Sequence, residues 1–170
     1  RILSSAASDV YKRQVLSVGD ESGIGPEIIL KALSSSEIPK NIDFILVGSK
    51  KNLQNTYIHL KALGLHNLAN PSDLQIHDLE ISPSDNESKS SYGNSSFYYL
   101  TKAIEIVKQY PNSALVTGPI CKKSWALAGH YFSGQTELLA QSCGVKNVGM
   151  LFTAKSPITG WRFNTLLATT

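Results

Sequence analysis

The sequence predicts an α/β fold with three layers, in which helices cover both faces of a mainly parallel sheet. Strand-like apolar runs alternate with helical patterns along the chain. Turns that contain glycine follow several of these runs. The 170 residues are 42% hydrophobic, which is enough to bury a core. Strands that alternate with helices favour a parallel sheet between helical layers.

Short apolar runs that stop at turn residues predict the strands, because strands of a parallel sheet are buried on both faces. The first run stops at Gly19 and the second at Gly48. The strands are expected at 15–18, 43–47, 74–79, 114–116 and 148–152, and a last one begins at 165 and continues to about 168.

Apolar residues at helical spacing predict the helices. Pro26 suits a first helical position, where its missing N–H costs nothing, and Gly64 suits a C-cap. Residues 82–96 are rich in Ser and Asn and are predicted to form a loop, with Ser95 or Ser96 capping the next helix. The helices are expected from 26 to about 33, at 50–63, from 96 to about 109, at 122–128 and at 136–143.

Composition narrows the class of protein. The net charge is only +3 and no dense basic cluster occurs, so no nucleic-acid partner is expected. No apolar run approaches the roughly 20 residues of a membrane span, so no membrane partner is expected either. The two cysteines, Cys121 and Cys143, form no CxxC pair, which favours reduced thiols in a cytoplasmic protein.

Residues 1–14 are predicted to be an adaptor-derived extension that is not native. The string from Asp9 to Gln14 can be back-translated into a sequence that resembles the transposase end used in library preparation. A genuine amphipathic arm is the alternative. Residues 15–170 then form the domain of interest.

Polar residues at three glycine-containing turns are the candidate site residues. Asp20 follows the first predicted strand, and Lys122 follows the strand that leads to Gly118. Gln135 and Thr136 open a predicted helix, where backbone N–H groups favour phosphate. Three of them have a structural alternative: Asp20 can hold backbone amides of its turn, Lys122 can be a surface residue, and Thr136 can be an N-cap.

The histidines show no metal-ligand spacing. His130 lies close to the Gly134 turn and is the one candidate among them, although packing or capping is the better explanation of it.

Four segments together resemble the 4-hydroxythreonine-4-phosphate dehydrogenase family. Residues 19–27 read GDESGIGPE, where the family has GDPAGIGPE. Residues 115–122 (LVTGPICK) are similar to its LVTAPISK or LITGPVHK, and 128–139 (AGHYFSGQTELL) to its AGHxFPGHTEML segment. Residues 167–170 (LATT) match a family segment that is followed by a histidine.

The resemblance implies an incomplete isocitrate/isopropylmalate-dehydrogenase-like fold and a homodimer when full length. It implies NAD- or NADP-dependent oxidation and decarboxylation of 4-hydroxythreonine 4-phosphate in pyridoxal 5'-phosphate (vitamin B6) biosynthesis. It assigns Gln135 and Thr136 to substrate binding, while Asp20 and Lys122 are expected to line the pocket. A divalent metal (zinc, magnesium or cobalt) is implied, but its family histidines would follow Thr170, so this chain contributes no metal ligand and is expected to be inactive alone.

Two positions depart from the family pattern. Gln135 replaces a histidine, and glutamine cannot become cationic. Glu21 replaces a proline, for which milder consequences are expected. The first departure favours one alternative, a paralogue acting on another phosphorylated hydroxy-acid. A non-catalytic domain that binds a phosphorylated ligand is a further alternative.

Overall fold

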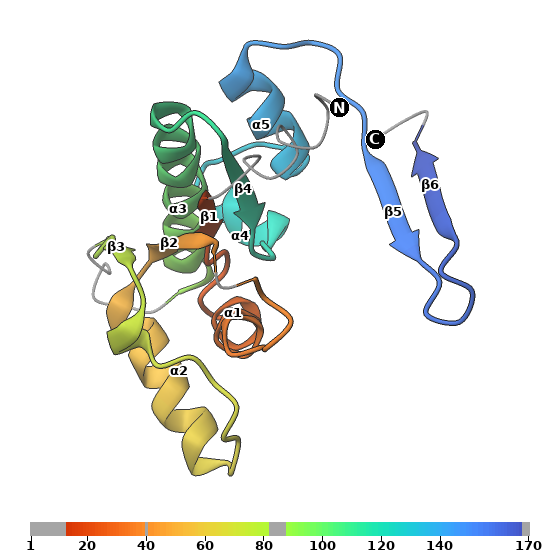
Figure 1. Ribbon diagram of the computed structural model, residues 1–170. Helices are drawn as coiled ribbons and strands as arrows, with labels where there is room; N and C mark the ends of the chain where they lie inside the picture. Colours follow the sequence, from red (N-terminus) through yellow and green to blue (C-terminus); the bar gives the residue numbers. More distant parts are fainter. Residues whose placement is uncertain (1–12, 40, 82–87, 168–170) are drawn as a thin grey trace. The chain divides into compact units, whose positions relative to one another are not determined.

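The computed structural model describes residues 13–39, 41–81 and 88–167, which belong to two compact units, 1–132 and 133–170. Figure 1 labels their elements. The strands of the first unit are β1 (Arg13–Ser17), β2 (Asp43–Gly48), β3 (Ile76–Asp78) and β4 (Ser113–Thr117). Its helices are α1 (Gly25–Leu33), α2 (Lys50–Ala62), the 3₁₀ turn η1 (Pro71–Asp73), α3 (Lys89–Gln109) and α4 (Lys122–Leu127).

The four strands of the first unit form one parallel sheet in the order β3-β2-β1-β4. Val15 of β1 lies opposite Ile45 of β2 and Leu115 of β4. Val15 and Ile45 are buried, as expected for central strands covered on both faces. The predicted parallel sheet is therefore confirmed.

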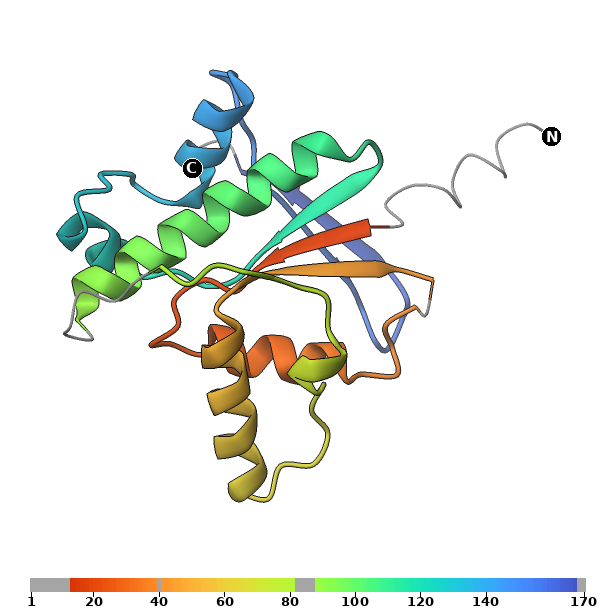
Figure 2. The same cartoon turned by 90° about the vertical axis from the view of Figure 1, so that its left-hand side faces the viewer.

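Helices lie on both faces of this sheet. Figure 2 shows α3 (green) on one side of the strands and α1 (orange) with α2 (gold) on the other. Leu30 of α1, Leu53 of α2 and Tyr99 of α3 are each at most 1% exposed and join the strands in one hydrophobic core. The predicted three-layer arrangement is confirmed.

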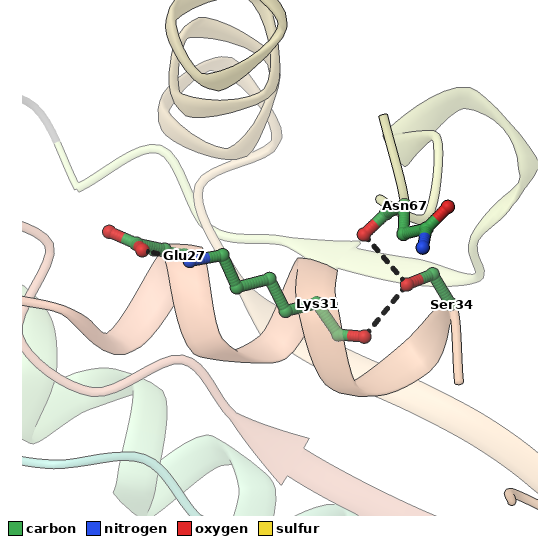
Figure 3. Close-up of polar contacts among 4 residues, drawn as sticks. All are labelled: Glu27, Lys31, Ser34 and Asn67. Carbon is green, nitrogen blue, oxygen red and sulfur yellow. Dashed lines mark hydrogen bonds and ion pairs between the residues drawn. The ribbon is translucent and has the colours of Figure 1, made fainter. Parts of the chain in front are cut away.

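Polar contacts hold the end of α1 against the segment that follows α2 (Figure 3). The Ser34 hydroxyl lies 2.8 Å from the carbonyl oxygen of Lys31 and 2.9 Å from that of Asn67. Lys31 also pairs with Glu27 one turn earlier in the helix. The exposed ion pair adds only a few tenths of a kcal/mol by itself, so the Ser34 contacts contribute more than the ion pair does here.

Helix α3 begins earlier than predicted, and the expected loop at 82–96 is wrong from residue 89 onward. Residues 82–87 lie outside the described residues. Ser88 is the N-cap and forms a reciprocal capping box with Ser91. The small residues are explained by close packing of α3 on α4: a Cβ on Gly93 would lie 2.0 Å from the Ser124 carbonyl oxygen. Composition alone does not distinguish such a contact from a loop.

The second unit contains α5 (Gln135–Cys143), β5 (Leu151–Lys155) and β6 (Arg162–Leu166). Gly144 ends α5 in the left-handed conformation, with φ of 67°. The strands β5 and β6 pair antiparallel, with Thr153 opposite Asn164, so the parallel arrangement of the first unit does not apply to them. Both begin three residues away from their predicted starts.

Strand β1 includes the last two residues of the segment predicted to be an extension. Arg13 pairs with Asp43 at 2.9 Å, and its guanidinium lies 4.4 Å from the Tyr110 ring centroid. Gln14 lies opposite Phe44 and Ala114 in the sheet. Residues 1–12 lie outside the described residues.

The loops that follow β1 and β4 interlock. The Asp20 amide donates to the Pro119 carbonyl oxygen at 2.9 Å, and the Gly118 amide donates to that of Ser17 at 2.8 Å. Each loop requires a glycine at the contact. A Cβ on Gly19 would lie 2.3 Å from the Pro119 carbonyl oxygen, and a Cβ on Gly118 would lie 2.3 Å from the Val18 carbonyl oxygen. Gly19 also has a φ of +80°, which favours glycine.

Substituting Gly19 with alanine should therefore destabilise the chain by about 2 kcal/mol or more, since backbone strain adds to a clash with main chain that cannot move aside. Gly64→Ala is the matched control: Gly64 has a φ of +85°, but a Cβ added there would have no other atom within 4 Å. It should cost about 1 kcal/mol, the penalty of the left-handed conformation alone. Urea unfolding measures both, and equal costs would contradict the interlocked loops.

Candidate functional site

The chain changes direction across the sheet at β1. It passes outward from β1 to β2 and β3, and α3 then returns it to β4 on the other side of β1. In parallel α/β sheets, ligands bind beyond the carboxyl ends of the strands at such a switch point. The loops after β1, β2, β3 and β4 all leave from this edge, which makes it the candidate site of the first unit.

Asp20 lies at this edge and is buried, at 8% exposure. Its Oδ1 accepts hydrogen bonds from the Ser22 amide at 2.9 Å and the Ser22 hydroxyl at 2.7 Å. The Asp20 carbonyl oxygen accepts from the Gly23 amide at 3.1 Å. The hydrogen bonds thus match the structural alternative, in which Asp20 holds its own turn together.

Lys122 is the first residue of α4 and is exposed. Cys121 precedes it as the N-cap residue, and hydrogen bonds from Ser124 lower the pKa of the Cys121 thiol. The side chain of Lys122 does not line the cavity described next, and neither does Asp20.

A cavity of about 590 Å³ opens at the carboxyl ends of β2 and β3, between the first turns of α2 and α3. This volume suits a small ligand. Its walls are mostly polar. The main lining residues are Glu21, Ser49, Asn52, Glu80, Asn94 and Tyr99.

Glu21 is the feature of this cavity that sequence reasoning missed. Its carboxylate accepts a hydrogen bond from the buried Tyr99 hydroxyl and another from the Ser49 backbone N–H. The milder consequences expected of this departure from the family pattern stay a prediction. The available signal was a charged residue among small ones directly after a buried strand.

Burial has the largest effect on the pKa values of Glu21 and Tyr99. It raises the pKa of the half-buried Glu21 carboxyl, and repulsion from Asp20 and Asp78 adds to the increase, although the two hydrogen bonds oppose it. Burial and the adjacent Glu21 carboxylate also raise the pKa of Tyr99, so its hydroxyl remains a donor at neutral pH.

Gln135 and Thr136 open α5 in the second unit, after the extended residue Gly134. Gln135 is the first helical residue, one position earlier than predicted, and Thr136 is therefore not the N-cap. Both side chains are half-buried. The first backbone N–H groups of a helix have no partner within the helix, which suits an anionic ligand group.

His130 serves in packing in the first unit. Its ring stacks on Phe97 at a centroid distance of 3.7 Å, and its Nε2 lies 2.8 Å from the Asn94 Oδ1. Burial lowers the pKa of His130, which favours the neutral ring.

Neither a metal centre nor a membrane span occurs among the described residues. No three His, Cys, Asp or Glu side chains within 13–39, 41–81 and 88–167 gather in a way that could hold a metal ion. No helix in the same ranges has both the length and the apolar character needed to cross a membrane.

The switch point and glycine-containing loops define a doubly wound α/β protein. Comparison with known proteins specifies the family. A family model described as pyridoxal phosphate biosynthetic protein PdxA matches residues 40–170, and the chain belongs to that family.

Relatives agree with this membership. The 4-hydroxythreonine-4-phosphate dehydrogenase of Synechococcus sp. (strain RCC307) is 44% identical over 160 residues, which cover 93% of this chain and 48% of that protein. The enzyme of the same name from Nostoc sp. (strain PCC 7120) is also 44% identical, over 168 residues, with 93% and 46% covered. The chain thus spans about half the length of the curated relatives it matches.

A solved structure shows the same fold. The crystal structure of a 4-hydroxythreonine-4-phosphate dehydrogenase from Burkholderia phymatum superposes with a TM-score of 0.71 at 22% sequence identity. The superposition covers 85% of this chain and 47% of that one.

The raised pKa of Glu21 predicts how stability depends on pH. The folded chain binds the proton of the Glu21 carboxyl more tightly than the unfolded chain does. The protonated carboxyl therefore favours folding at low pH, and this contribution to stability is lost as the pH rises through the pKa of the folded state. The unfolding free energy of the wild type, minus that of Glu21→Gln, should therefore fall from about pH 4 to about pH 7. Urea unfolding of both proteins measures this difference, and a difference that rises with pH would contradict the assignment.

Proposed function

We propose that the full-length protein is a 4-hydroxythreonine-4-phosphate dehydrogenase that acts in pyridoxal 5'-phosphate biosynthesis. The observation that carries this proposal is the PdxA family match over residues 40–170. The names of the relatives at 44% identity support the same reaction. The protein would oxidise the substrate hydroxyl with NAD or NADP and decarboxylate the resulting keto product.

The nicotinamide would accept the hydride, and a divalent metal (zinc, magnesium or cobalt) would polarise the reacting oxygen. The described residues offer no ligand set for that metal, so no step is assigned to a metal ligand of this chain. Gln135 and Thr136 would bind the phosphorylated substrate, supported by their position in the first turn of α5. Asp20 would fix the loop after β1, and Lys122 is exposed and can approach an anionic group.

The partners proposed with this activity are a phosphorylated small molecule and a second copy of the protein, in the cytoplasm. We include a second copy of the protein because the family resemblance implies a homodimer. Cys121 and Cys143 are both free thiols, which suits a reducing compartment.

A paralogue acting on another phosphorylated hydroxy-acid is the second candidate. Gln135 favours it, because glutamine stands where the family segment has a histidine. A glutamine offers a neutral hydrogen bond and cannot carry the positive charge of a protonated histidine.

Changing Gln135 to histidine in the full-length protein separates the two candidates. A charged hydrogen bond exceeds a neutral one by roughly 1 kcal/mol, so KM for 4-hydroxythreonine 4-phosphate should fall about fivefold below about pH 6.5, where histidine is protonated. Glu137→Gln, on the exposed side of the same turn, is the control and should change KM less than about twofold. If Gln135→His instead raises KM for this substrate at every pH, the paralogue is the better account.

The 170-residue chain alone should not reduce NAD or NADP with 4-hydroxythreonine 4-phosphate and a divalent metal. The reason is that the described residues supply no metal ligand set. Absorbance at the wavelength of reduced nicotinamide measures this, with the full-length Synechococcus relative as the positive control. Turnover by the chain alone would contradict this prediction, because the reaction would then need no metal-ligating residues other than those of the chain.

A further inference from the structure

The side chain of Glu21 ties the turn after β1 to two helices. Inside the turn, the amide and the hydroxyl of Ser22 both donate to the Asp20 carboxylate. The hydrogen bonds of Glu21 leave the turn instead, since its carboxylate accepts from the Tyr99 hydroxyl of α3 and from the Ser49 backbone N–H at the start of α2. These two hydrogen bonds, the Glu21 tether, therefore join the turn to helices on opposite faces of the sheet (Figure 2).

Both donors of the Glu21 tether are held in place by the fold. Tyr99 is 1% exposed and belongs to the hydrophobic core. Ser49 is the N-cap of α2, and its hydroxyl accepts from the Asn52 amide at 3.1 Å. Because neither donor has to be ordered when it meets the carboxylate, the tether can restrict the turn at little cost in entropy.

The exposed part of the turn needs such a restraint. Ser22, Gly23 and Ile24 are exposed, and the Gly23 amide donates to the carbonyl oxygen of Asp20 within the turn. Glycine adds conformational freedom at this point. The turn lies at the carboxyl edge of the sheet, where ligands of such folds bind. A loose loop there would have to be ordered by the ligand, which weakens binding.

The family pattern indicates what the tether replaces. The family segment GDPAGIGPE has a proline where this chain has Glu21. A proline ring fixes φ and reduces the freedom of the unfolded loop. A glutamate leaves φ free, so the same order has to come from contacts of its side chain. The hydrogen bonds to Tyr99 and Ser49 are contacts of this kind.

We propose that Glu21 is a positioning residue, which keeps the loop after β1 in the conformation that binds the substrate. The Glu21 tether supplies the restraint that a proline ring would supply at the same position. Glu21 acts through the loop and is assigned no contact with the substrate. The substrate is that of the proposed function, on which this part of the inference rests, whereas the tether rests on the hydrogen bonds of Tyr99 and Ser49.

Amide hydrogen exchange at Ser22 measures the order of the turn in the 170-residue chain. Tyr99→Phe keeps the ring and removes the hydroxyl, so exchange at Ser22 should become about tenfold faster as a hydrogen bond to a charged group is lost. Tyr98→Phe is the matched control, because Tyr98 is the exposed neighbour, and it should change this exchange less than about twofold. Unchanged exchange in Tyr99→Phe would overturn the proposal.

A second background shows whether Tyr99 acts through Glu21. Glu21→Pro has no carboxylate for the hydroxyl to hold, so adding Tyr99→Phe to it should change exchange at Ser22 less than about twofold. An equal acceleration in both backgrounds would overturn the tether, because Tyr99 would then act by packing alone. Glu21→Ala provides the same comparison if Glu21→Pro does not fold.

Kinetic constants of the full-length protein test the positioning role. Tyr99→Phe should raise KM for 4-hydroxythreonine 4-phosphate at least about threefold and change kcat less than about twofold, because fewer free molecules have the ordered loop and bound substrate restores it. An unchanged KM would overturn the positioning role. Absence of turnover by the unmodified full-length protein would instead overturn the proposed function, and the exchange of Ser22 would still decide whether Glu21 holds the loop.

Discussion

The close contact between the loops after β1 and β4 is the constraint on which the rest of the first unit depends. Two backbone hydrogen bonds join these loops, from Asp20 to Pro119 and from Gly118 to Ser17. Gly19 and Gly118 leave no room for a Cβ at the crossing. The contact fixes where β1 ends, and thereby places Asp20 in its turn and Glu21 in the cavity wall. A ligand site at the carboxyl edge of a parallel sheet needs such rigid loops, because its groups come from separate loops.

Glu21 and Tyr99 extend this constraint into the core. Tyr99 is 1% exposed and belongs to α3, which covers one face of the sheet. Its hydroxyl would lose its carboxylate partner without Glu21, and Glu21 would lose its strongest anchor without Tyr99. The pair therefore couples the helical layer to the loop after β1. It also keeps the Glu21 carboxylate in the cavity wall.

Periodicity predicted the architecture well, because the central strands are apolar on both faces and the helices carry apolar stripes. It failed where long-range packing overrides local composition. Gly93 and Ser96 resemble loop residues, but they allow α3 to approach α4, and Ser96 accepts a hydrogen bond from Trp125. The sequence shows that Glu21 departs from the family pattern, but it does not show the role of this residue, because the partner Tyr99 is distant in sequence. The family motifs identified Gln135 and Thr136 as candidates, and their contact with substrate stays a prediction.

Amide hydrogen exchange at Asp20 tests the interlocked loops most directly. In the 170-residue chain, the opening free energy of this amide should approach that of the buried strand β1, because breaking its bond to Pro119 requires β1 and β4 to separate. Exchange of the Asp20 amide as fast as that of an unstructured loop would contradict the account, since the two loops would then be free to move apart without unfolding.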